Sequence, residues 1–172
     1  MQLKTILDSL KKSLTEKFPT VQNIADHERF TAATKLPAFL TEITDLTPAT
    51  PSGDDGTERF CSTVKFATFI IYPTDGDERE NRIAARVLAL RFAHVIKYKI
   101  QLPTVTQPSV TDIATDYLSA SGDNAAGADN AALVEVQRVD WEVDGWTGES
   151  IWQDDAIGSL ALDEGQPAPL SE

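Results

Sequence analysis

The chain has 172 residues, of which 41% are apolar, and its 27 acidic and 15 basic side chains give a net charge of −12. This length and apolar content fit one domain with a proper core, while the acidic balance argues against nonspecific nucleic-acid binding, which needs clustered Lys and Arg. No run of eighteen apolar residues is present, so no membrane span is expected, and an N-terminus without an apolar signal core predicts a cytosolic product.

The first predicted element is an amphipathic helix at the N-terminus. Its apolar residues recur with the spacing of one helical face: Leu3, Ile6, Leu7, Leu10 and Leu14. Pro19 disfavours helical backbone at the residue before it, so the helix should end there. We expect this apolar face to pack on a sheet.

Three strands are expected in the next fifty residues. Residues 21–30 are typical of a short edge strand, and residues 36–46 predict a strand after a turn. A loop rich in Pro, Gly and Asp follows, roughly over residues 47–56. Residues 58–72 give the clearest strand, and its second half is apolar on both faces. This strand should therefore lie centrally, antiparallel to the strand before it.

A long helix is predicted from about residue 76 to residue 97. Asp75 followed by Glu78 resembles an N-cap with its partner at the third helical position. The predicted buried face consists of Ile83, Val87, Leu90 and His94, widened by Ala84, Leu88, Phe92 and Val95. Together with Phe66, Phe69 and Ile70 of the central strand, this face should form the centre of the core.

Beyond Pro103 the pattern loosens. Residues 111–119 suggest a short helix, and residues 120–131 a flexible loop or insertion. A strand is expected over 132–143, with a turn near residues 144–145 and a return over 150–157, and residues 159–172 should be a disordered tail. The elements predict one α+β domain over residues 1–158: a mixed or mostly antiparallel sheet with the N-terminal helix and the long helix on one face.

The candidate catalytic and metal motifs are incomplete. Ser9 and Lys12 have the spacing of a serine–lysine nucleophile, but the companion motifs are absent. His27-Glu28 begins like a zinc motif, yet Thr31 stands where the second histidine belongs. His94 is more simply a packed or helix-boundary histidine. We therefore expect no enzyme, no catalytic or metal-binding residues and no cofactor.

Other single features have equally plain interpretations. Cys61 is the one cysteine, and its place in a strand predicts a small core residue. The acids that begin at Asp75 resemble a calcium loop, but Glu80 stands where the loop glycine is required, so helix capping explains them better. The adjacent pairs Asp54-Asp55 and Asp154-Asp155 are interpreted as solvated loop acids.

All three tryptophans, Trp141, Trp146 and Trp152, fall in one acidic stretch over residues 136–155. The neighbouring carboxylates would repel phosphates, so base stacking is disfavoured, while sheet packing or a subunit interface is the default role. Sugar binding stays open. The alternation predicts that Trp141 packs with Val139 and Val143 on one strand face, and that Asp140, Glu142 and Asp144 point to the other.

The order of these elements, and four segments within it, resemble the tail terminator (tail completion, minor tail) proteins of tailed phages over residues 1–160. The segments are Leu36-Pro-Ala-Phe-Leu-Thr-Glu-Ile, Phe66-Ala-Thr-Phe-Ile-Ile-Tyr with the Asp77–Leu88 helix start, Val139-Asp-Trp-Glu-Val, and Ser150-Ile-Trp-Gln-Asp-Asp-Ala-Ile. The region 120–130 and the tail after Ser159 depart from the family pattern.

The resemblance implies a small α+β subunit that forms a closed ring, usually a homohexamer, without catalytic residues. Such a ring caps the tail tube, ends its polymerisation and presents a head-joining surface. The implied partners are copies of itself, the tail tube protein and a head–tail connector protein, with DNA passing the lumen without specific binding. The implied location is the virion tail, assembled in the host cytoplasm. The alternative is a small non-catalytic module that binds carbohydrate or protein through the Trp-rich acidic segment.

Overall fold

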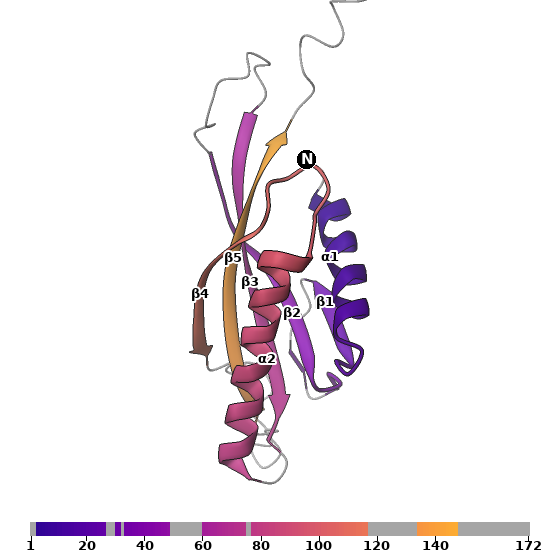
Figure 1. The fold of residues 1–172 in the computed structure, drawn as a ribbon, viewed down its shortest axis with the longest axis vertical. Helices are drawn as coiled ribbons and strands as arrows, with labels where there is room; N and C mark the ends of the chain where they lie inside the picture. The colour runs from indigo at the N-terminus through magenta and orange to yellow at the C-terminus, as the bar shows by residue number, and fades with distance from the viewer. Residues whose placement is uncertain are drawn as a thin grey trace, which may run out of the picture.

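The computed structural model describes residues 3–26, 30–31, 33–48, 60–74, 77–116 and 134–147. In these ranges, two helices lie on one face of a five-stranded mixed sheet, which confirms the α+β class (Figure 1). The elements are α1 (Leu3–Lys17), β1 (Asn23–Asp26), β2 (Ala38–Pro48), β3 (Phe60–Pro73), α2 (Glu78–Lys99), β4 (Ser109–Asp116) and β5 (Val134–Thr147).

The strand order is β1-β2-β3-β5-β4. β1 runs parallel to β2, and the other three pairs are antiparallel. β3 is therefore the central strand and β1 a short edge strand, and both predictions are confirmed. The predictions for residues 49–59, 120–131, 150–157 and 159–172 lie outside the described residues.

Helix α1 forms as its apolar spacing predicts. Ile6, Leu7, Leu10 and Leu14 are all buried, and the helix ends at Lys17, ahead of Pro19. Burying one such side chain stabilises the fold by roughly 1.5–3 kcal/mol. This single face therefore ties α1 to the sheet.

The centre of the core lies between α2 and the paired strands β3 and β5. Phe66 and Trp141 are cross-strand partners, and their rings stack at 4.2 Å between centroids. The indole Nε1 of Trp141 donates a hydrogen bond to Thr68 Oγ1 at 3.0 Å, and Thr68 in turn bonds Thr41 Oγ1 at 3.0 Å. These bonds satisfy polar groups that burial would otherwise leave unpaired.

An aromatic cluster joins both helices to the sheet. Phe39 of β2 meets Phe18, just beyond α1, edge-on at 5.0 Å and Phe92 of α2 at 5.2 Å. All three rings are at most 2% exposed. Edge-to-face aromatic pairs contribute about 0.5–1.5 kcal/mol beyond their burial, so this cluster fixes the position of the two helices over β2.

Two predictions for the second half of the chain are wrong. Residues 109–116 form strand β4 instead of a helix, because their β-branched residues pair with β5 along the sheet edge. Nor does the chain turn at Asp144-Gly145. β5 continues to Thr147, since β3 extends far enough to pair with it: Thr63 faces Asp144 and Ser62 faces Gly145.

The N-cap of α2 is also corrected. Asp77 caps the helix, and its Oδ1 accepts hydrogen bonds from Arg79 N at 2.8 Å and Glu80 N at 3.2 Å. Asp75 lies outside the described residues. The helix runs two residues further than expected, to Lys99, where Gln107 Nε2 donates to the carbonyl oxygens of Lys97 and Ile100. Both ends of α2 are thus fixed by side-chain hydrogen bonds.

Candidate interaction surface

Helix α2 is apolar on two opposite sides. The side toward the sheet buries six residues: Ala85, Leu88, Ala89, Phe92, Ala93 and Ile96. The side directly away from the sheet exposes four large ones, here called the α2 ridge: Ile83 (53%), Val87 (50%), Leu90 (59%) and Tyr98 (62%). The two rows lie about half a turn apart, because each residue advances about 100° around a helix. The ridge is therefore the outermost surface of the subunit over α2.

The ridge corrects the predicted buried face. Ile83, Val87 and Leu90 do not enter the core, and His94 is exposed beside Tyr98 instead of packed. The inner side inserts Leu88, Phe92 and Ile96 into the core, and the small alanines at 85, 89 and 93 beside them let the helix pack against β3 and β5. An alanine every fourth residue was the signal in the sequence that marks the close-packed side.

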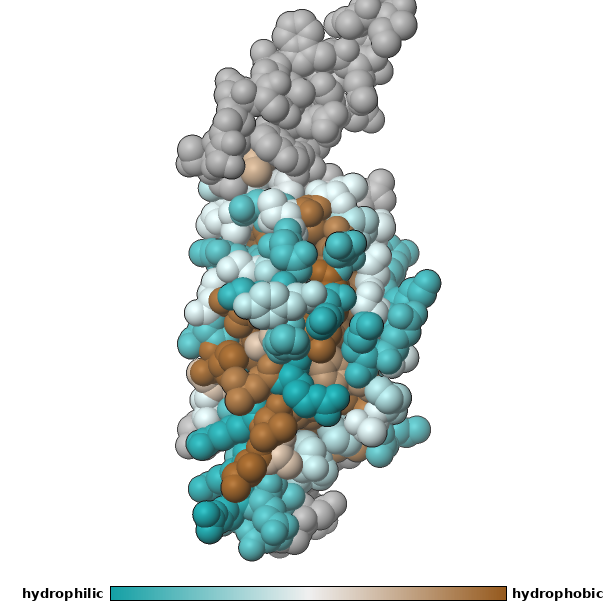
Figure 2. Space-filling view, in the orientation of Figure 1, coloured by the Kyte–Doolittle hydropathy of each residue, from teal (hydrophilic) through white to brown (hydrophobic). Residues whose placement is uncertain are grey.

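The space-filling view displays this ridge as a surface feature. A band of apolar atoms runs diagonally over the lower half of α2, with hydrophilic side chains along both borders (Figure 2). A row of exposed large apolar side chains on one helix is unusual for a surface that meets only water. We therefore treat the ridge as the candidate functional surface.

The borders of the ridge are cationic. Helix α2 has six basic and two acidic residues, a balance of +4, in a chain whose net charge is −12. Arg86 and Arg91 lie on opposite sides of the ridge by helical position. The guanidinium of Arg91 sits 5.6 Å from the ring centroid of Phe18, and Lys97 Nζ lies 5.3 Å from that of Tyr98. These contacts hold the cations along the helix.

The face of the sheet opposite the helices, here called the open sheet face, has the reverse charge. No helix among the described ranges lies on it (Figure 1). By strand register it carries seven acidic residues against two basic ones, a balance of −5: Glu42, Asp45, Asp112, Asp116, Asp140, Glu142 and Asp144 against Lys65 and Arg138. A smaller apolar cluster occupies the other end of this face: Ala25, Ala38, Leu40, Ile71 and Val136.

Part of this charge is paired within the face. Lys65 Nζ lies 3.5 Å from Asp45 Oδ2, and Arg138 Nε donates to Asp140 Oδ1 at 2.8 Å. The bond to Asp140 raises the already high pKa of Arg138. Since acids outnumber bases, the face keeps an anionic surplus after these pairs form.

The structure describes the side chain of Trp141 but not those of Trp146 and Trp152. Trp141 is 1% exposed and packs in the core with Val139 and Val143, whereas Asp140, Glu142 and Asp144 belong to the opposite face. The predicted alternation is confirmed. Trp141 offers almost no surface to a partner because its ring is buried, and its interface role stays a prediction. Trp146 lies in β5 with its side chain outside the described part, and Trp152 is outside it altogether.

The other candidate reactive residues in the described part, Cys61, Ser9 and His94, lie in three different elements. Cys61 is buried, as expected, and its burial together with the nearby Asp144 carboxylate raises the pKa of the thiol. Ser9 lies half-buried on α1. Among the described residues, no cluster of three His, Cys, Asp or Glu side chains could hold a metal ion. His27 and both adjacent aspartate pairs lie outside these residues.

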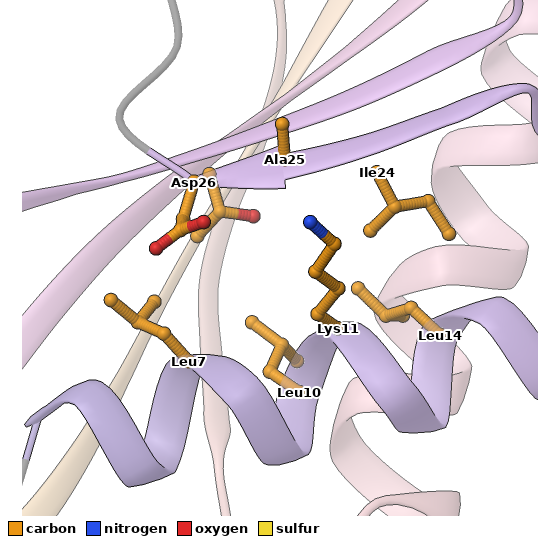
Figure 3. A pocket seen from close by; sticks show the side chains of 8 residues that line it. Leu7, Leu10, Lys11, Leu14, Ile24, Ala25 and Asp26 are labelled. Carbon is orange, nitrogen blue, oxygen red and sulfur yellow. The ribbon is translucent and has the colours of Figure 1, made fainter.

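A small depression separates α1 from β1. Leu7, Leu10, Leu14 and Ile24 line it, with Lys11 extending from the helix toward the strand (Figure 3). Its cavity volume is only about 10 Å³, whereas ligand pockets usually enclose about 300–1,000 Å³. We interpret it as a packing gap between helix and edge strand.

A scan against models of known protein families finds no match to this chain, and neither does a search of curated proteins. No helix in the described ranges is both long and apolar enough to cross a membrane.

Proposed function

We propose that this protein is a structural subunit that joins copies of itself into a ring at the end of a phage tail tube. The ring stops tube polymerisation and presents the surface that joins the head. The observation that carries this proposal is the α2 ridge: four large apolar side chains, 50–62% exposed, on a helix with both ends capped. Such a rigid, outward apolar row suits a protein–protein contact.

Two further features support the proposal. Segments 36–43, 66–72 and 77–88, which carry the resemblance to tail terminators, fall on β2, β3 and α2, so they belong to one structural unit. The chain's net charge of −12 suits a ring through which DNA passes, because phosphates do not adhere to an acidic surface. The carbohydrate alternative is weakened, since Trp141 is buried in the core.

The test uses tail tubes grown from purified tube protein of the same phage. Adding this protein at a small fraction of the tube subunits should halt elongation, and negative-stain images should reveal a ring at one tube end. An equal amount of a heat-denatured sample is the control. Tubes that elongate at an unchanged rate and end without a ring would contradict the proposal.

A further inference from the structure

We infer that the α2 ridge of one copy docks on the open sheet face of a second copy, in a head-to-tail contact. The inference rests on the proposed function, and it names the two surfaces that the assembly uses. The ridge offers apolar side chains between Arg86 and Arg91, while the open sheet face offers a surplus of carboxylates. Each surface supplies the charge that the other lacks.

The acids on the open sheet face are accessible from two strands. Glu42 and Asp45 of β2 are exposed on one side of the sheet centre, and Asp112 of β4 is exposed on the other. A helix laid between these strands would place its two cationic borders near carboxylates on both sides. The apolar row would then cover the methylene groups of Lys65, which is exposed on β3 between these strands.

A contact between two ridges is disfavoured by the same charges. In an antiparallel helix pair centred between Val87 and Leu90, the Arg86 side chains of the two copies would lie on one side of the contact and their Arg91 side chains on the other. Like charges at such flanking positions destabilise helix pairs. The ridge therefore requires an acidic partner surface, and the described part of the chain supplies one on the far side of the sheet.

The placement of the two surfaces makes the contact repeatable. Helix α2 lies on one face of the sheet (Figure 1), and the ridge is on its exposed side, so the ridge and the open sheet face lie on opposite sides of the molecule. A contact between different surfaces leaves one of each unoccupied at the ends, so it repeats from copy to copy, and a ring forms when the rotation between successive copies closes. It also covers the second face of each sheet with a helix, the common layer arrangement of α/β structures.

Two charge variants at exposed positions test the inference. The ridge variant combines Val87→Asp with Leu90→Asp, and the face variant combines Glu42→Lys with Asp112→Lys. Sedimentation velocity at low salt should reveal association of the wild type and monomers for each variant alone. An equimolar mixture should give a 1:1 dimer and nothing larger, because one intact ridge then meets one intact face. Lys12→Asp, on the exposed side of α1, is the control and should leave association unchanged.

Several outcomes overturn the inference. The inference is wrong if the wild type stays monomeric at about 1 mM protein and low salt, because salt then screens the charges on the two surfaces least. The inference is also wrong if a mixture of the two variants remains monomeric although circular dichroism shows that both are folded. A synthetic peptide of residues 148–172 that blocks wild-type association would identify that acidic segment as the occupant of the ridge instead.

These results are separable from the proposed function. If the ridge variant still forms rings on tail tubes, the inference fails and the function stands. If the variants complement each other in solution but the wild type neither caps nor halts tubes, the inference stands and the function fails.

Discussion

The two helices lie on the same side of the sheet, yet only one of them could be oriented from its sequence. Helix α1 has a single apolar face, and the structure buries Ile6, Leu10 and Leu14 as that face predicts. Helix α2 has two apolar rows, and the structure buries the row that combines three alanines with Leu88, Phe92 and Ile96. Periodicity identifies an apolar row, but when two rows compete, the space beside the sheet decides between them.

The largest effect should come from placing a charge on the one apolar face of α1. Ile6 is fully buried, so Ile6→Asp would desolvate a carboxylate without a partner and should lower the free energy of unfolding by more than about 4 kcal/mol. Urea denaturation followed by circular dichroism measures this loss. Lys12→Asp, on the solvent side of the same helix, should change it by less than about 0.5 kcal/mol.

A smaller but still severe loss is expected on the inner side of α2. Phe92 contacts Phe18 and Phe39 and is fully buried, so Phe92→Ala would leave a cavity beneath both helices. We expect a loss of about 3–5 kcal/mol in the free energy of unfolding, measured by the same urea titration. A loss below about 1 kcal/mol would mean that α2 does not pack on the sheet through this side.

The close approach of α2 to the sheet can be tested directly. Ala89 is fully buried on the inner side, so Ala89→Leu would force the helix outward or strain the core, with an expected cost of about 1–3 kcal/mol. Differential scanning calorimetry should record a lower melting temperature. A variant as stable as the wild type would show that the alanine row does not set the helix position. The small size of these alanines would then not explain why the ridge residues are exposed.

The sequence predicted most of the first half of the fold for physical reasons that can be named. The alternation in β3 placed Phe66 and Ile70 on one face, and its apolar second half placed the strand centrally. Local sequence patterns gave the wrong secondary structure where pairing with a neighbouring strand decided it. Residues 109–116 became a strand because β5 offers an edge, and the turn expected at Asp144-Gly145 did not form because β3 continues beside it.

The candidate surface was harder to predict than the fold. The tryptophans and acids of residues 136–147 were the obvious place for an interface, yet the pairing with β3 buries Trp141 and leaves only the carboxylates on the open sheet face. The ridge was hidden because its residues, Ile83, Val87 and Leu90, are ordinary core residues by composition. Only the geometry of the alanine row reveals that they point outward.

The smallest effect on stability should come from the ridge itself. Leu90 is 59% exposed, so Leu90→Ala removes little buried area and should change the free energy of unfolding by no more than about 0.5 kcal/mol. Leu88→Ala is the matched control on the same helix, and because Leu88 is 9% exposed it should lose about 2–5 kcal/mol. The measurement should be made where the protein is monomeric, since association would add its own stabilisation to the wild type. Equal losses for the two variants would mean that the ridge is already covered within the subunit, and it would then be unavailable to a second copy.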